Sequence, residues 1–104
     1  MHVDVTGSCH CNAISLTARV NPEYVVMCHC TDCQTIASAP YKVSVPVLPE
    51  NLRLTGGLST YVKVGGSGKK RRLAFCGVCG SAVYSTSMDD KPEFFTLRWG
   101  LIHQ

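Results

Sequence analysis

Hydrophobic and polar positions alternate along most of this 104-residue chain, in short runs rich in Val, Thr, Tyr and Phe. A period of two predicts half-buried β-strands, and the Gly, Pro and Asn residues between the runs predict turns. The predicted strands are Val3–Thr6, Ala13–Val20, Tyr24–Met27, Tyr41–Pro46, Leu52–Thr55, Thr60–Val64, Arg71–Phe75, Ala82–Ser85 and Phe94–Trp99. The pattern indicates a mainly β, antiparallel protein.

Helical periodicity is almost absent from the chain. Only Thr31–Ala37 predicts a short helical turn, because no other segment has the length and the 3.6-residue period of a helix. Pro46 and Pro49 are expected to end the strand that begins near Tyr41, because proline cannot donate a hydrogen bond to a neighbouring strand. The expected architecture is therefore a small β-sheet domain with at most short helical turns.

Composition places the chain among globular proteins and predicts one domain, residues 1–104. Hydrophobic residues make up 45% and charged residues 16% of the sequence. We expect a cytoplasmic protein without a membrane partner, because the N-terminus lacks the features of a signal peptide and no apolar run approaches the roughly 20 residues of a membrane span.

The net charge of +3 is mild and comes partly from the run Lys69–Arg72. No basic face or interleaved aromatic residues accompany this run, so no nucleic-acid partner is expected. Two interpretations of the run stay open: a solvated strand edge, or a rim that binds the carboxylate of a peptide thiol such as glutathione.

Seven cysteines carry the candidate chemistry. They lie in Cys9-His10-Cys11, Cys28-His29-Cys30-Thr31-Asp32-Cys33 and Cys76-Gly77-Val78-Cys79. In a reducing compartment, dense cysteine indicates metal binding, and an odd count argues against a simple disulfide framework. Seven divides into four and three: four thiolates close a structural zinc site, whereas three leave one position open, as in catalytic zinc sites.

The segment Cys76-x-x-Cys79-Gly80 has the form of a zinc knuckle, and Gly77 and Gly80 are expected to supply positive φ in its turn. A thioredoxin-like redox pair is the rival interpretation, but that motif begins a long helix, and the residues after Gly80 predict a strand. Cys9-x-Cys11 is the natural second pair and is expected to meet the knuckle across a sheet. The alternative is that these cysteines are buried without a metal.

The middle segment predicts a metal site with an open position. Cys28, Cys30 and Cys33 can face one point if the chain wraps around a metal ion. The fourth ligand would be water, a substrate, His10, His29 or Asp32. Such a site prefers another thiolate and keeps a bound thiol deprotonated. The chemistry indicated is activation of a small-molecule thiol, or of a cysteine released from the metal.

These cysteine segments resemble the glutathione-dependent formaldehyde-activating enzyme (GFA) family, which includes the centromere protein V domain. The resemblance extends to Pro40-Tyr41 and Leu97-Arg98-Trp99-Gly100. The resemblance runs from Gly7 to about Gly100, and all seven cysteines match in order and spacing. It implies an Mss-like (β-tent) fold. It also implies two zinc ions per chain, one structural on Cys9, Cys11, Cys76 and Cys79, and one catalytic and labile on Cys28, Cys30 and Cys33.

The activity that the resemblance implies is a carbon–sulfur lyase acting between glutathione and formaldehyde, with Cys30 as a cysteine that can leave the metal. The chain departs from the family pattern at Asn12, Gln34, Thr35, Ser38 and His103. Gln34 and Thr35 replace basic residues that would suit a glutathione carboxylate. Two alternatives to an enzyme therefore stay open: a zinc-stabilised interaction module, and a thiol/zinc redox sensor.

Overall fold

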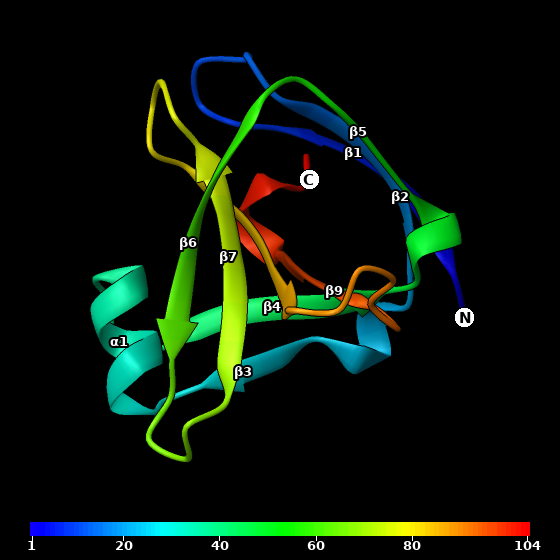
Figure 1. The fold of residues 1–104 in the computed structure, drawn as a ribbon. Helices are drawn as coiled ribbons and strands as arrows, with labels where there is room; N and C mark the ends of the chain where they lie inside the picture. Colours follow the sequence, from blue (N-terminus) through cyan, green and yellow to red (C-terminus); the bar gives the residue numbers. More distant parts are fainter.

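The computed structural model describes residues 1–104 and confirms a mainly β protein (Figure 1). The strands are β1 (Val3–Ser8), β2 (Ser15–Val20), β3 (Val26–Cys28), β4 (Lys42–Val47), β5 (Leu52–Thr55), β6 (Leu58–Val64), β7 (Lys70–Cys76), β8 (Ala82–Ser87) and β9 (Phe95–Arg98). The single α-helix is α1 (Thr31–Ala37), with the bounds predicted from the sequence. Short 3₁₀ turns occupy Pro22–Tyr24, Pro49–Asn51 and Trp99–Leu101.

The strands form two antiparallel sheets. A three-stranded sheet has the order β1-β2-β5, and a six-stranded sheet has the order β3-β4-β9-β8-β7-β6. In Figure 1 the small sheet lies across one end of the larger, strongly curved sheet, and α1 lies beside β6. No helix is long and apolar enough to cross a membrane.

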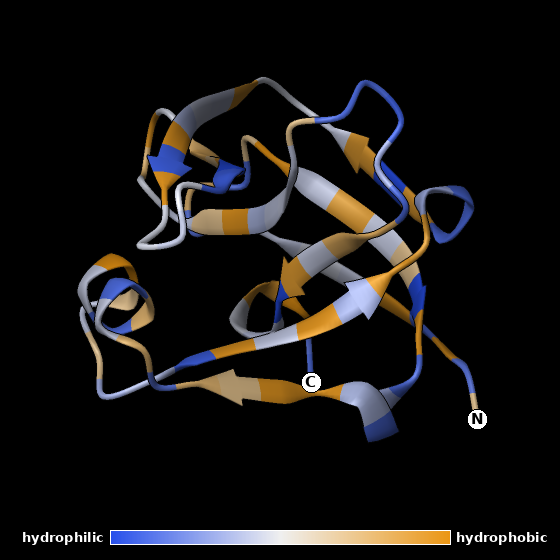
Figure 2. Cartoon of the chain, turned by 60° about the horizontal axis from the view of Figure 1, so that its bottom comes forward, coloured by the Kyte–Doolittle hydropathy of each residue, from blue (hydrophilic) through white to orange (hydrophobic).

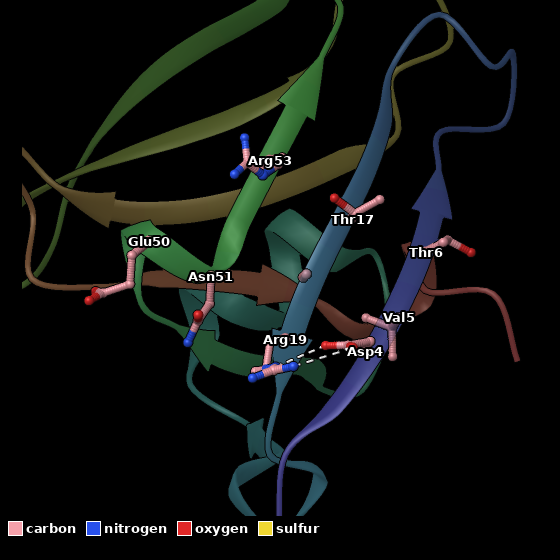
Figure 3. Close-up of a pocket in the computed structure, with 9 residues that line it drawn as sticks. Asp4, Val5, Thr6, Thr17, Arg19, Glu50, Asn51 and Arg53 are labelled. Carbon is pink, nitrogen blue, oxygen red and sulfur yellow. Dashed lines mark hydrogen bonds and ion pairs between the residues drawn. The ribbon is translucent and has the colours of Figure 1, made fainter.

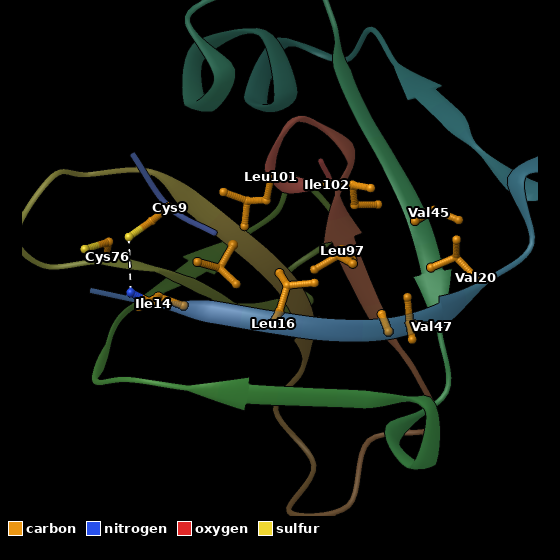
Figure 4. Packing of buried hydrophobic residues seen from close by; sticks show 12 residues of the cluster. Cys9, Ile14, Leu16, Val20, Val45, Val47, Cys76, Leu97, Leu101 and Ile102 are labelled. Carbon is orange, nitrogen blue, oxygen red and sulfur yellow. Dashed lines mark hydrogen bonds between the residues drawn. The ribbon is translucent and has the colours of Figure 1, made fainter. Parts of the chain in front are cut away.

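The core lies between the two sheets because the period-two pattern turns one face of each strand inward. In β2, Leu16, Ala18 and Val20 are buried, whereas the residues between them are exposed. Figure 2 shows these alternating bands along the strands. The core cluster in Figure 4 consists of Cys9, Ile14, Leu16, Ala18, Val20, Val45, Val47, Cys76, Val83, Leu97, Leu101 and Ile102.

The C-terminal segment closes against β1. Ile102 forms a β-bridge with Gly7, and the His103 backbone N–H donates to the Thr6 carbonyl over 2.8 Å. A Cβ atom on Gly7 would lie 2.4 Å from the Leu101 carbonyl oxygen. Glycine is therefore required here for close approach of two backbones.

Several sequence-based strand limits are wrong, and Tyr24 and Trp99, predicted as strand ends, lie in 3₁₀ turns. Ala13 and Ile14 lie outside β2, in the turn that returns the chain from Cys9. Pro46 does not end β4, which continues to Val47. Pro46 pairs with Thr96 of β9, whereas β3 pairs with β4 only as far as Ser44. One side of β4 is thus unpaired at Pro46, and proline is tolerated at such an edge.

Candidate metal centres

The structure brings Cys9, Cys11, Cys76 and Cys79 together as the four-cysteine group. Their sulfur atoms all lie within 4.8 Å of one another. The Cys11 Sγ atom lies 3.7 Å from both Cys9 Sγ and Cys76 Sγ. In a tetrahedral zinc–thiolate site with metal–sulfur bonds of about 2.3 Å, neighbouring sulfurs lie about 3.8 Å apart. The spacing of the group therefore fits a tetrahedral metal ion.

Backbone geometry around Cys76 is that of a metal knuckle. The Val78 and Cys79 backbone N–H groups donate to Cys76 Sγ over 3.4 and 3.5 Å. Gly80 has the predicted positive φ, at 82°. The expectation for Gly77 is wrong, because its φ is not positive. A Cβ atom there would lie 2.5 Å from Ser59 Oγ, so a larger residue at this position would require the Ser59 side chain to rotate away.

The other half of the group comes from the turn after β1. The Ile14 backbone N–H donates to Cys9 Sγ over 3.3 Å, and Asn12 takes a φ of 67°, which asparagine tolerates better than most residues. Cys9 and Cys76 lie buried at one end of the core (Figure 4). The two pairs meet between the two sheets rather than across one sheet, so the group ties β1 to β7.

Electrostatics at the four-cysteine group favour a thiolate at Cys79, whereas, despite a backbone hydrogen bond from Ala13, burial and the neighbouring thiols raise the pKa of Cys11 to about 11. The Ser81 hydroxyl and backbone, with further backbone hydrogen bonding and the Cys76 thiol, lower the pKa of Cys79 to about 5. The Ser81 Oγ atom lies 3.2 Å from Cys79 Sγ and also accepts a hydrogen bond from the His10 backbone N–H. A cation is the natural partner of several thiolates held this close.

Cys28, Cys30 and Cys33 also converge, as the three-cysteine group, with sulfur atoms within 4.8 Å of one another. Cys28 ends β3, Cys30 caps α1, and Cys33 lies buried in its first turn. The Cys28 and Cys30 sulfurs lie 3.5 Å apart. The Cys33 backbone N–H donates to Cys30 Sγ over 3.3 Å and lowers the pKa of Cys30 to about 7. Burial raises the pKa of Cys33 to about 11.

No side chain of the protein completes this group. His29 packs against Tyr41 with ring centroids 5.5 Å apart, and Asp32 forms an ion pair with Lys63 over 3.5 Å. His10 lies beside Ser81 at the other group. None of these three side chains belongs to the set of converging ligand atoms. The three-cysteine group can therefore offer three thiolates and leave a fourth position to a ligand.

Two cavities share part of their walls, and Cys28 of the three-cysteine group lines one of them. The sequence interpretation missed most of the residues that line these cavities. An apolar cavity of 380 Å³ is lined by Ile36, Lys42, Tyr61, Leu73, Ala74, Phe75, Gly80, Ala82, Tyr84, Ser85 and Arg98. A basic cavity of 170 Å³ is lined by Val26, Cys28, Lys42, Ser44, Lys63, Arg71, Leu73, Ser85 and Thr96. The signals in the sequence were the Lys69–Arg72 run, which contains Arg71, and the polar residues Lys42 and Ser44 that alternate with Val43 and Val45 along β4.

The Lys69–Arg72 run does not form a sheet edge. Lys70–Arg72 lie in β7, which is hydrogen-bonded to β6 on one side and β8 on the other. Lys70 is exposed, but Arg71 turns inward and donates hydrogen bonds to Ser85 Oγ and Thr96 Oγ1 over 3.2 and 3.5 Å. One residue of the run thus belongs to the basic cavity.

A further cavity of 350 Å³ lies on the three-stranded sheet (Figure 3). Arg19 donates to the Asp4 carboxylate over 2.9 Å along its floor, so these opposite charges satisfy each other. None of the seven cysteines lines this cavity. We therefore place the candidate chemistry at the three-cysteine group.

Comparisons with known proteins find a matching family model, a curated relative and a solved structure of the same fold. The model of the family described as glutathione-dependent formaldehyde-activating enzyme matches residues 4–104. An uncharacterized lyase of Schizosaccharomyces pombe is 28% identical over 97 residues, covering 89% of this chain and 65% of that protein. This chain thus spans slightly less than two thirds of that relative. A crystal structure of a Rhodobacter sphaeroides protein shares the fold, with a TM-score of 0.71, 21% identity, and coverage of 92% of this chain and 85% of that one.

Proposed function

Because this chain belongs to the glutathione-dependent formaldehyde-activating enzyme family, we propose that it is a zinc-dependent carbon–sulfur lyase acting on adducts of a small-molecule thiol. The observation that carries the proposal is the three-cysteine group, which converges without a fourth protein ligand beside two cavities. The lyase name of the fission yeast relative supports the same reaction class.

The proposal assigns different roles to the two cysteine groups. Cys9, Cys11, Cys76 and Cys79 hold a structural zinc, since two of them are buried and four thiolates leave no position for a substrate. Cys28, Cys30 and Cys33 hold a catalytic zinc. When bound there, zinc keeps a coordinated substrate thiol deprotonated at neutral pH and so supplies a nucleophile.

The reaction forms or breaks one carbon–sulfur bond. In synthesis, the lone pair of the substrate sulfur attacks the carbonyl carbon of an aldehyde, and the C=O π electrons move to oxygen, which takes a proton from water. Cleavage reverses these steps and returns a thiol and an aldehyde. Of the three cysteines that would hold the zinc, Cys30 is the one that could be released, because it is exposed whereas Cys28 is half-buried and Cys33 is buried.

Glutathione and formaldehyde are the substrates that we propose. The family description names this pair. Gln34 and Thr35 of α1 are uncharged, so they cannot form an ion pair with a glutathione carboxylate. The positive charge for such a pair has to come from another part of the site. Lys42, Lys63 and Arg71 of the basic cavity are available for this purpose.

The proposal is tested on freshly purified protein in two steps. Native mass spectrometry should count two zinc ions per chain. NMR exchange measurements with glutathione and ¹³C-formaldehyde should then show adduct formation and cleavage above the spontaneous rate. Two zinc ions with no rate enhancement over a panel of thiols and aldehydes would refute the lyase assignment and leave the metal assignment in place.

A redox sensor is the second candidate, and one observation favours it. The exposed Cys30 thiol, whose pKa is lowered to about 7 by the Cys33 backbone N–H, lies 3.5 Å from Cys28 Sγ. A peroxide would oxidise the Cys30 thiolate to a sulfenic acid, with the other peroxide oxygen leaving as water. Zinc release by mild peroxide, reversed by a reductant, together with an absence of lyase activity, would favour this function.

A further inference from the structure

The apolar cavity lies on the same face of the large sheet as a member of the three-cysteine group. Cys28 of β3 is directly opposed to Lys42 of β4, and Ser44, two residues further along β4, is directly opposed to Arg98 of β9. Residues that are directly opposed, or two apart on one strand, project from the same face of a sheet. Lys42 and Arg98 both line the apolar cavity. Its wall therefore belongs to the sheet face that carries Cys28.

The helix that holds Cys33 also contributes to this cavity. Ile36 lines the cavity and lies three residues after Cys33 in α1, so the two side chains lie on one side of the helix. On the sheet, Tyr61 and Leu73 are directly opposed on β6 and β7, and Phe75 follows Leu73 on the same face. Most of the wall is hydrophobic. A hydrocarbon group is therefore a better occupant of this cavity than water.

One charged group of the wall has no partner in the protein. The Arg98 side chain is half-buried and makes no hydrogen bond and no ion pair, in contrast to Arg19 and Arg71. Burial lowers the pKa of Arg98, and the charge of a Cys33 thiolate opposes this shift, so the guanidinium group lies within electrostatic reach of the three-cysteine group. The N–H groups of Arg98 are free to donate to an oxygen atom of a ligand.

The cavity is larger than formaldehyde requires. Its volume is 380 Å³, room for about a dozen water-sized groups and within the range of roughly 300–1,000 Å³ for small-molecule sites. Formaldehyde has a single carbon and no hydrocarbon group. Glutathione carries charges at both ends, which suit the cations of the basic cavity better than an apolar wall. The aldehyde is therefore the reactant whose hydrocarbon group fits the apolar cavity.

We propose that the apolar cavity binds the hydrocarbon chain of an aldehyde and that Arg98 donates a hydrogen bond to the aldehyde oxygen. The inference rests on the proposed function, since it concerns the electrophile of the same reaction. When the substrate sulfur attacks the carbonyl carbon, the C=O π electrons move to oxygen, and the guanidinium group stabilises the negative charge that develops there. Water then supplies the proton, because arginine stays charged. The aldehydes that this protein uses thus extend from formaldehyde to longer, uncharged alkanals.

Kinetics with a series of linear alkanals test the cavity. NMR exchange measurements on the zinc-loaded full chain with glutathione give kcat/KM above the spontaneous rate for propanal, pentanal and heptanal, with formaldehyde as the reference. The carbonyl groups of the three alkanals are alike, so differences between them report contacts of the chain. Each methylene group that leaves water contributes about fourfold. We expect kcat/KM to rise at least about tenfold from propanal to heptanal.

A variant of the wall assigns this effect to the cavity. Ile36→Ala should lower the ratio of kcat/KM between heptanal and propanal by at least about threefold, because the shorter side chain offers less apolar contact. Thr35→Ala is the matched control, since Thr35 is the preceding residue of α1, is exposed and does not line the cavity. The control should keep the wild-type ratio. Equal ratios in the two variants would overturn the assignment of the chain to this cavity.

Arg98→Met tests the contact with oxygen. Loss of one preorganised donor to a developing oxyanion lowers kcat by about 10²–10³, and Arg98→Lys, which keeps a charge and a donor, should recover part of the loss. The melting temperature of Arg98→Met should not fall, because methionine replaces a half-buried cation without a protein partner. A lower melting temperature with unchanged kcat would make Arg98 a structural residue and overturn its contact with the substrate.

Heptanamide gives a measurement that does not depend on activity, because its carbonyl group does not add thiols. Its titration should shift the NMR signals of Ile36, Leu73 and Phe75, which line the cavity. Arg98→Met should bind heptanamide more weakly than the wild type, since the carbonyl oxygen loses its donor. Shifts confined to residues outside the cavity would overturn the inference.

The outcomes separate this inference from the proposed function. Turnover of formaldehyde without a gain for longer alkanals would overturn the inference while the lyase assignment stands. A gain with longer alkanethiols in place of longer alkanals would also overturn it, because the cavity would then take the thiol. Binding of heptanamide in the cavity without turnover of any aldehyde would support the cavity as a site for such chains and overturn the lyase assignment. Neither binding nor turnover would overturn both.

Discussion

The Cys11 and Cys76 sulfur atoms lie 3.7 Å apart, although 65 residues separate them in the sequence. Cys11 follows β1 of the three-stranded sheet, and Cys76 ends β7 of the six-stranded sheet. A metal ion shared by these sulfurs would join the two sheets at the point where the core ends. The four-cysteine group therefore has the position of a structural site, whereas the three-cysteine group lies beside cavities.

Cys76→Ser should unfold the protein. A structural zinc contributes about 10–16 kcal/mol in isolated zinc-finger peptides, which is comparable to the whole stability of a domain, about 5–15 kcal/mol. Circular dichroism should show loss of the β spectrum and of the cooperative melting transition. Val78→Ser is the matched control, because Val78 lies in the same turn and is 79% exposed. An unchanged melting temperature of Cys76→Ser would contradict the structural role.

Cys30→Ser should abolish lyase activity and preserve the fold. Cys30 is exposed and contributes no side chain to the core cluster, so its replacement removes a thiolate without creating a cavity. The exchange rate between thiol and adduct should fall to the spontaneous value, and the melting temperature should stay close to that of the wild type. Loss of folding in this variant would refute the division into a structural and a catalytic site.

Gly7→Ala should destabilise the closure of the C-terminal segment on β1. The added Cβ atom would lie 2.4 Å from the Leu101 carbonyl oxygen, and backbone atoms can give way only by moving apart. Overpacking of this kind costs about 1–3 kcal/mol of unfolding free energy, which denaturant titration measures. Gly57→Ala is the control, since a Cβ atom on Gly57 would meet nothing within 4 Å. Equal midpoints for the two variants would count against the close approach.

Arg19→Gln should raise the pKa of the Asp4 carboxyl group toward its ordinary value. The hydrogen bond and the charge of Arg19 hold that pKa below the ordinary value. Because the folded-state pKa is lowered, the pair adds stability above the ordinary carboxyl pKa, and this contribution is lost as pH falls through the folded value. The contribution is small, since both side chains are largely exposed. NMR titration of Asp4 in the two proteins measures the shift, and identical titration curves would disprove the pairing.

Much of the secondary structure could be predicted because its signals are local. The alternation in β2, with Leu16, Ala18 and Val20 inward, is visible within six residues. Cysteine spacing likewise identifies two pairs and a triplet, because ligands two or three residues apart can face one point without help from the rest of the fold. Pro46 was wrongly predicted to end a strand. Proline lacks a backbone N–H, and this interrupts a strand only where a neighbouring strand would accept a hydrogen bond from that position.

The sequence by itself determined the antiparallel β character, the bounds of α1, the family and the grouping of the cysteines. Only the tertiary structure decided that Cys9 and Cys11 meet the knuckle between two sheets, and that Lys42, Lys63 and Arg71 from three strands line one cavity together with Cys28. Side-chain periodicity is set by the backbone of one strand, whereas a cavity depends on strand order, register and sheet curvature. These arise from contacts between distant segments, which no local pattern encodes.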